Sequence, residues 1–100
     1  MFFLGELKRL FRDLKKEINA YLSLEQVTEV RKACKFAYLA HTGQKRRSGE
    51  PYIIHPIAVA KILAEMRMDH HTLIAALLHD TLEDTATDKA TLIAEFGPEV

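Results

Sequence analysis

Apolar residues recur at intervals of three and four along most of the chain, which is the spacing of one face of an α-helix. In the first segment this stripe consists of Leu4, Leu7, Phe11, Leu14 and Ile18. Charged residues fill most of the other positions, so we predict an amphipathic N-terminal helix within residues 1–22. The favoured interpretation is that it packs on its own domain. Pairing with another chain or binding to a membrane surface stays open, because two heptads are too few to decide.

A second helix and a loop follow. Ser23 and Gln26 have the spacing of a capping box, and the apolar stripe that begins there continues to about His41. Gly43 ends this helix. Residues 43–52 have turn-forming residues at both ends and no apolar residue before Pro51, which predicts an exposed loop.

Three further helices complete the predicted fold. Pro56 suits the first position of a third helix, which is apolar around much of its circumference and is therefore expected deep in the core. Asp69 can cap a fourth helix. Thr87 or Asp88 can start a fifth helix, which ends at Gly97. Since no segment alternates between apolar and polar residues as a strand does, we predict an all-α helical bundle.

The composition limits the possible functions. One hundred residues correspond to one domain at most. Fourteen basic and fourteen acidic residues balance, so a general nucleic-acid binder is not expected and any anion site must be local. The single Cys34 suits a reducing compartment, which makes the cytoplasm the expected location. No apolar run approaches the ~18 residues that a membrane span needs, so neither a signal peptide nor a membrane partner is expected.

The fourth predicted helix carries a candidate metal site. His79 and Asp80 end an otherwise apolar stretch, where an uncompensated carboxylate would be costly to bury. Imidazole and carboxylate groups are the ligands that manganese, iron or zinc accept, and His55 at the start of the third helix can supply another. We therefore predict that His55, His79 and Asp80 hold one divalent metal, with ligating atoms within roughly 5 Å of one another.

Two carboxylates follow these predicted ligands at a spacing of one helical turn. Glu83 stands one helical turn beyond His79, and Asp84 one turn beyond Asp80, so both should face the same cavity. A solvated helix end would explain this acidic pair equally well if it stood alone. The other histidines are not counted as ligands: His70 and His71 are expected to face solvent, and His41 to be a hydrogen-bonded core residue.

The predicted loop supplies three consecutive cations. Lys45, Arg46 and Arg47 can bind phosphate oxygens, and the guanidinium groups can also stack on a base. Ordinary surface charge is the simpler explanation for such a triplet. Function is favoured because the loop leads directly into the helix that carries His55.

Two segments together resemble a known family. Residues 43–56, GQKRRSGEPYIIHP, and residues 75–85, AALLHDTLEDT, followed by Phe96 and Gly97, resemble the hydrolase domain of the RelA/SpoT homologues of the bacterial stringent response. The resemblance covers about residues 23–100. In that family an all-helical HD domain binds manganese and hydrolyses the guanosine alarmone (p)ppGpp to GDP or GTP and pyrophosphate.

The resemblance also implies roles for individual residues. It makes His55, His79 and Asp80 metal ligands of Mn2+, Glu83 and Asp84 the catalytic acidic pair, and Arg46, Arg47 and Ser48 contacts of the substrate. Synthetase-only members of the family have lost the His-Asp and Glu-Asp residues, whereas this chain retains them. The motifs therefore predict a hydrolase.

Two departures from the family pattern change what is expected of this chain. The family completes its metal site with an aspartate on a later helix, and its long members add synthetase and regulatory domains, none of which this sequence contains. Residues 23–100 are therefore expected to be an incomplete HD domain, the N-terminal half of the fold, from a long bifunctional member. With its cover missing, a large apolar groove is expected beside His79 and Asp80, together with weak manganese binding.

Two other functions remain open at the level of sequence. An HD phosphohydrolase could act on another nucleotide, although the loop motif argues against this. Alternatively, the chain could be a catalytically silent module that binds a nucleotide or partner helices. Metal-dependent turnover separates these alternatives from the alarmone hydrolase.

Overall fold

The computed structural model describes residues 2–45, 49–84 and 89–97, without the side chains of residues 2–4, 80 and 82–84. Its helices are α1 (Phe2–Asn19), α2 (Leu24–Ala40), α3 (Ile54–Glu65), α4 (His70–Asp84) and α5 (Lys89–Phe96). The predicted all-α fold is confirmed, and the β structure of the described residues is limited to one isolated bridge between Lys45 and Pro51. No helix in these ranges is both long and apolar enough to cross a membrane.

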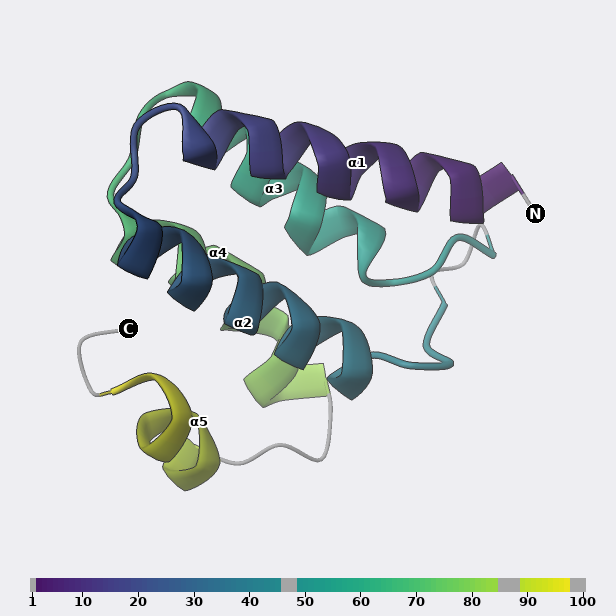
Figure 1. Cartoon of the computed structure of the whole chain (residues 1–100). Helices are drawn as coiled ribbons and strands as arrows, with labels where there is room; N and C mark the ends of the chain where they lie inside the picture. Colours follow the sequence, from purple (N-terminus) through teal and green to yellow (C-terminus); the bar gives the residue numbers. More distant parts are fainter. Residues whose placement is uncertain (1, 46–48, 85–88, 98–100) are drawn as a thin grey trace.

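The first four helices are arranged as two pairs (Figure 1). α1 packs against α3, α2 packs against α4, and α3 also contacts α4, whereas α1 and α2 touch less extensively. α5 lies against α2, where the Phe36 and Phe96 rings meet edge to face at 5.5 Å. The Nζ atom of Lys32 also donates a 2.7 Å hydrogen bond to the carbonyl oxygen of Glu95. The five helices therefore form one packed unit.

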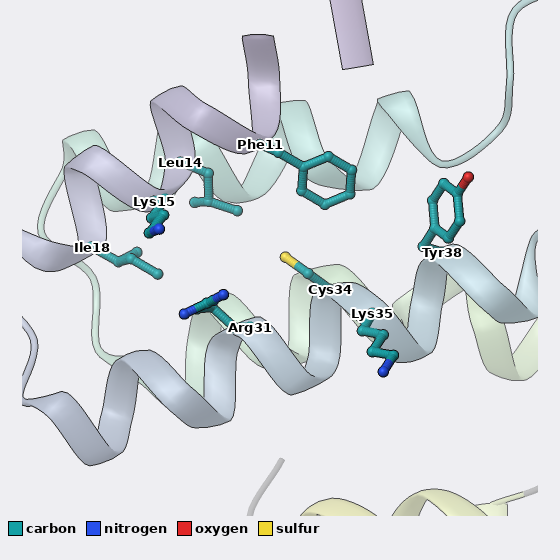
Figure 2. A pocket seen from close by; sticks show the side chains of 8 residues that line it. All are labelled: Phe11, Leu14, Lys15, Ile18, Arg31, Cys34, Lys35 and Tyr38. Atoms are coloured by element: carbon teal, nitrogen blue, oxygen red, sulfur yellow. The ribbon is translucent and has the colours of Figure 1, made fainter. Parts of the chain in front are cut away.

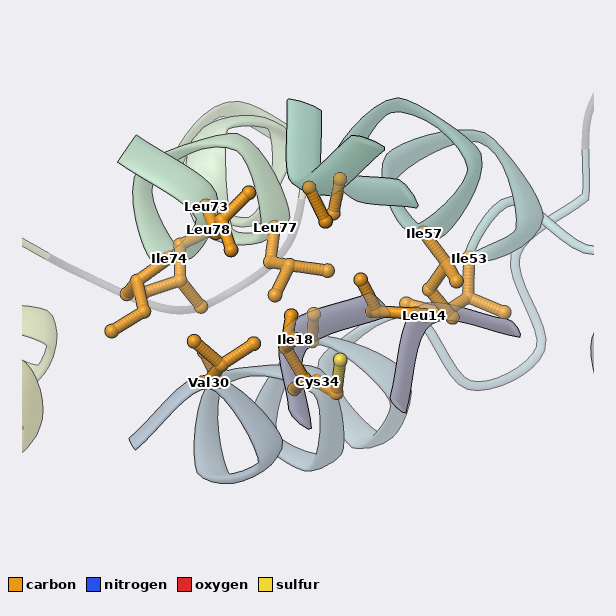
Figure 3. Close-up of a cluster of buried hydrophobic side chains, with 14 of the residues drawn as sticks. Leu14, Ile18, Val30, Cys34, Ile53, Ile57, Leu73, Ile74, Leu77 and Leu78 are labelled. Carbon is orange, nitrogen blue, oxygen red and sulfur yellow. The ribbon is translucent and has the colours of Figure 1, made fainter. Parts of the chain in front are cut away.

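Every one of the first four helices contributes to a single hydrophobic core (Figure 3). Leu14 and Ile18 of α1 meet Val30 of α2, Ile57 of α3 and Leu77 of α4, and all five side chains are buried. Complete burial of such a side chain stabilises the fold by about 1.5–3 kcal/mol. The apolar stripe of α1 thus faces the interior of this chain, as the favoured interpretation of its periodicity expected.

The predicted helix ends agree with the observed caps. The Ser23 hydroxyl accepts a hydrogen bond from the Gln26 backbone N–H, and the Gln26 side chain accepts one from the Ser23 N–H, which completes the capping box. Asp69 caps α4, and its hydrogen bonds with Thr72 lower the pKa of the Asp69 carboxyl. Gly43 and Gly97 adopt positive φ angles of 84° and 87° just after α2 and α5. Thr87 and Asp88, the expected start of α5, lie outside the described residues.

Two predictions for α3 were wrong. The helix begins at Ile54, two residues before Pro56, because the first backbone N–H groups of a helix have no intrahelical acceptor and a proline in the first turn costs none. α3 is also not enclosed on all sides in the described structure. Ile57 is buried, whereas Ile62 and Met66 are 55% and 60% exposed, since α1 and α4 cover the other side of the helix.

Candidate metal centre and nucleotide loop

α4 carries the His-Asp motif, and its buried side packs into the core. Leu73, Leu77 and Leu78 are buried in the core, and this fixes the rotation of the helix about its axis. His79 is then exposed. The backbone of Asp80 continues the helix, and its side chain lies outside the described residues. The structure therefore leaves the imidazole of His79 accessible at the surface beside the core.

A tight turn positions His55 at the start of α3. The N–H of Ile54 donates to the Pro51 carbonyl and the N–H of His55 donates to the Tyr52 carbonyl, each at 3.2 Å. Ile53 and Ile54 are buried and anchor the turn, while His55 points away from the core and is exposed. Because α3 packs against α4, the two helices that carry His55 and His79 are neighbours in space.

The predicted convergence of three ligating side chains stays a prediction. The described side chains contain no group of three histidine, cysteine, aspartate or glutamate residues able to hold a metal. The set that the sequence predicts includes Asp80, whose side chain is not among them. Glu83 and Asp84 are helical residues of α4, one turn beyond His79 and Asp80, and their side chains also lie outside the description.

The basic loop is anchored at both ends. Lys45 and Pro51 form an isolated antiparallel bridge, and the Tyr52 N–H donates a 3.0 Å hydrogen bond to the Gln44 carbonyl. Gly49 has a φ of 87°, a backbone conformation that side chains other than glycine rarely adopt. Lys45 is exposed. Arg46, Arg47 and Ser48 lie outside the described residues, so their predicted contacts with substrate stay a prediction.

A recess lies at the foot of this loop. Its volume is about 320 Å³, and it is bounded by the start of α1, the end of α2 and the two anchored ends of the loop. Tyr38, His41, Lys45 and Pro51 are among its lining residues. Its wall therefore combines aromatic, cationic and backbone polar groups.

His41 contacts both the basic loop and α4, the helix that carries the His-Asp motif. It is only 3% exposed; its Nδ1 lies 2.8 Å from the Gln44 Oε1, and its Nε2 lies 3.4 Å from the Thr81 Oγ1. Its ring also stacks on Tyr52, with centroids 4.8 Å apart. The expectation of a hydrogen-bonded core histidine is confirmed.

Sequence reasoning did not identify the partners of His41. Thr81 follows Leu73 and Leu77 at intervals of four, which places it on the buried stripe of α4 and makes a polar partner necessary. That spacing is the sequence feature that could have indicated it. His70 and His71 differ from expectation too, because both are half-buried and their rings lie 4.1 Å apart.

Comparisons with known proteins agree with these motifs. The family model described as HD domain matches residues 33–100. The chain is 54% identical over 91 residues to a protein of Vibrio cholerae serotype O1 named guanosine-3′,5′-bis(diphosphate) 3′-pyrophosphohydrolase. It is 50% identical over 91 residues to the bifunctional (p)ppGpp synthase/hydrolase SpoT of Escherichia coli K12. Each alignment covers 91% of this chain and 13% of the relative.

A plant relative extends the range of similarity. The chain is 57% identical over 76 residues to a putative GTP diphosphokinase RSH1, chloroplastic, of Oryza sativa, which covers 76% of this chain and 8% of that relative. The chain thus spans a small part of the length of the curated relatives that it matches. The resemblance to RelA/SpoT homologues that the motifs indicated is confirmed by these relatives.

Proposed function

The chain belongs to the HD domain family, and we propose on this premise that it provides the metal-binding part of a hydrolase acting on guanosine 3′,5′-bis(diphosphate). The reaction would release pyrophosphate from the 3′ position. The main observation behind this proposal is that the neighbouring helices α3 and α4 bear the exposed side chains of His55 and His79. The chain that carries them is 54% identical over 91 residues to a protein named as a 3′-pyrophosphohydrolase. Since the chain spans 13% of that relative, the activity is proposed for the whole protein to which such a segment belongs.

HD domain hydrolases are metal-dependent, and the residues present here fit a divalent cation. Two exposed imidazoles on adjacent helices, together with the carboxylate of Asp80, would provide the mixed nitrogen and oxygen donors that manganese accepts. We assign His55, His79 and Asp80 as the ligands. When bound, the cation would supply a water molecule of lowered pKa and neutralise charge on a phosphate oxygen.

The acidic pair would handle the attacking water. Glu83 and Asp84 follow the two proposed ligands of α4 by four residues, a spacing that places i and i+4 on the same face of a helix. A carboxylate at this position can orient a water molecule toward the 3′ phosphorus and accept its proton. We propose that the pair performs these two tasks.

The loop would hold the nucleotide. Arg46, Arg47 and Ser48 lie between Lys45 and Gly49, and the bridge between Lys45 and Pro51 ties this segment to the turn that precedes His55. Arginine can contact phosphate with two parallel hydrogen bonds and can stack on a purine. We propose that the anchored loop orients the alarmone relative to the metal ligands.

The domain assignment follows from the same observations. We infer that residues 23–100 belong to the HD domain, beginning at the Ser23 capping box, and that α1 is an added N-terminal helix. Because Leu14 and Ile18 of α1 are buried in the shared core, this helix should be retained in any variant used for measurement.

The decisive test is a chimera in which this chain replaces the matching segment of the Vibrio cholerae relative. With manganese, the chimera should release pyrophosphate from guanosine 3′,5′-bis(diphosphate) but should not act on GDP. His79→Ala should abolish release, and His70→Ala, a change of the same type on the same helix, should not. Equal effects of the two substitutions would contradict the proposal.

Activity on other nucleotides at the same rate would favour a general HD phosphohydrolase. Nucleotide binding without release of pyrophosphate would favour a catalytically silent module.

A further inference from the structure

A groove lies between α1 and α2, and it is separate from the proposed metal centre. Its volume is about 340 Å³. Four residues of each helix line it: Phe11, Leu14, Lys15 and Ile18 of α1, and Arg31, Cys34, Lys35 and Tyr38 of α2 (Figure 2). None of these residues is among the predicted ligands or substrate contacts.

The groove results from the way the helices pair. α1 packs mainly on α3 and α2 mainly on α4, so the first two helices contact each other only lightly. The lining residues recur at three- and four-residue intervals, which places them on the facing sides of the two helices. Cys34 has a small side chain that points into the gap, where a larger residue would fill the space. The Phe11 and Tyr38 rings, with centroids 6.3 Å apart, close one end.

The floor of the groove is apolar. Leu14, Ile18 and Cys34 are 2%, 1% and 7% exposed, so they form its deepest part, and Phe11 extends the apolar wall. Burial raises the pKa of the Cys34 thiol to about 12, although the neighbouring Arg31 opposes this shift. The floor therefore presents hydrocarbon and a neutral thiol.

The charges on the rim all have one sign. Lys15, Arg31 and Lys35 line the groove, and none of them forms an ion pair within the part of the chain that the structure describes. By contrast, Lys32 on the same helix is paired with Glu95. Figure 2 shows Lys15 and Arg31 at the end of the groove where Ile18 lies. Figure 2 also shows that the Lys35 side chain extends from α2 away from α1. Two cations beside an apolar floor, in a chain of zero net charge, create a local preference for an anion.

We propose that this groove binds a small amphipathic anion, a medium-chain fatty carboxylate, with its hydrocarbon tail on the apolar floor and its head group between Lys15 and Arg31. The apolar tail of such a ligand matches the apolar floor, and its negative carboxylate matches the positive charges of the lining. Lysine and arginine can extend their charged ends toward the carboxylate while their methylene groups cover the tail. This site goes beyond the proposed hydrolase function and does not depend on it.

The size of the groove favours a small molecule over a protein partner. Its volume lies at the lower end of the roughly 300–1,000 Å³ that small-molecule sites occupy. A stable protein interface usually involves about 20–30 residues on each side, whereas eight residues line this groove. A nucleotide fits less well, because the lining offers no amide or carboxylate to recognise a base.

Dodecanoate is the appropriate probe, used below its micelle concentration with the whole chain. Calorimetry should show one binding site for dodecanoate and much weaker binding of dodecyltrimethylammonium, which has the same tail and the opposite charge. Because Cys34 is the single cysteine of the chain, its rate of alkylation by iodoacetamide reports on the groove directly. Dodecanoate should slow this reaction. Equal binding of both amphiphiles, or unchanged alkylation at saturating dodecanoate, would overturn the proposal.

Two matched pairs of substitutions locate the head group. Lys15→Glu with Arg31→Glu should weaken dodecanoate binding by roughly tenfold or more, because two attractions become repulsions. Lys8→Glu with Arg9→Glu changes the net charge equally at exposed positions of α1 outside the groove and should leave the affinity within about twofold. Equal losses from both pairs would show non-specific charge attraction and refute the site.

A third variant tests the floor without altering charge. Cys34→Met places a longer apolar side chain into the gap and should block the tail, so that dodecanoate binding is lost while helicity and thermal unfolding remain close to those of the unsubstituted chain. Retained binding in a folded Cys34→Met variant would contradict the proposal. Should that variant unfold, the comparison of the two charge pairs decides alone.

Discussion

The Nε2 atom of His41 lies 3.4 Å from the Oγ1 atom of Thr81, so a buried histidine that ends α2 touches the residue that follows the His-Asp motif on α4. The same ring stacks on Tyr52, three residues before His55. One core side chain is thus in contact with both segments that carry the proposed ligands. This arrangement distinguishes a buried residue that stabilises both segments from the exposed residues that we propose as ligands.

Substitution of His41 should therefore affect stability, and substitution of His55 should not. His41→Ala removes a buried hydrogen-bonding ring, and the free energy of unfolding should fall by about 1–3 kcal/mol. His55 is exposed, so His55→Ala should change it by less than about 0.5 kcal/mol. Urea unfolding followed by circular dichroism measures both. Similar losses of unfolding free energy from the two substitutions would contradict the claim that His41 is structural and His55 is not.

Manganese binding should depend on the proposed ligands alone. His55→Ala and His79→Ala should each abolish saturable binding measured by electron paramagnetic resonance, because two remaining protein ligands hold the cation poorly. His70→Ala is the control. Affinity should be weak in this chain and stronger in the chimera with the Vibrio cholerae relative, since the family resemblance implies a further aspartate ligand. Equal affinities would show that three ligands suffice.

The acidic pair should be necessary for turnover but not for metal binding. In the chimera, Glu83→Gln preserves shape and removes a base, so turnover should fall on the order of a hundredfold or more. Manganese content should persist. Glu29→Gln, at an exposed position of α2, should leave turnover unchanged. A Glu83→Gln chimera with full activity would remove Glu83 from the catalytic role.

The thiol of Cys34 should make stability depend on pH in the alkaline range. Its pKa is raised from 9.0 to about 12 by burial, so the unfolded chain releases this proton more readily than the folded chain. The contribution is complete below the unfolded value and is lost as pH rises toward the folded value. Unfolding free energies measured across this window should fall more steeply with pH for the unsubstituted chain than for Cys34→Ala. Parallel slopes would show that the thiol is not protected by burial.

The sequence by itself determined the local structure of this protein. The capping box at Ser23 and the cap at Asp69 are interactions between residues three apart, and the end of α5 at Gly97 depends on the conformational freedom of that residue. Such features are encoded within one or two helical turns. For the same reason the proposal that His79, Asp80, Glu83 and Asp84 act together rests on their spacing along α4, and the buried role of His41 could be predicted from its place on an apolar stripe.

Tertiary structure decided which faces and partners the helices use. The periodicity of α3 does not reveal that Ile62 and Met66 remain exposed, because the pattern is apolar on nearly every side and only the positions of α1 and α4 select the covered face. The contact between His41 and Thr81 joins residues 40 positions apart. It depends on the angle and distance between two helices, and these follow from how the whole core packs rather than from any short segment.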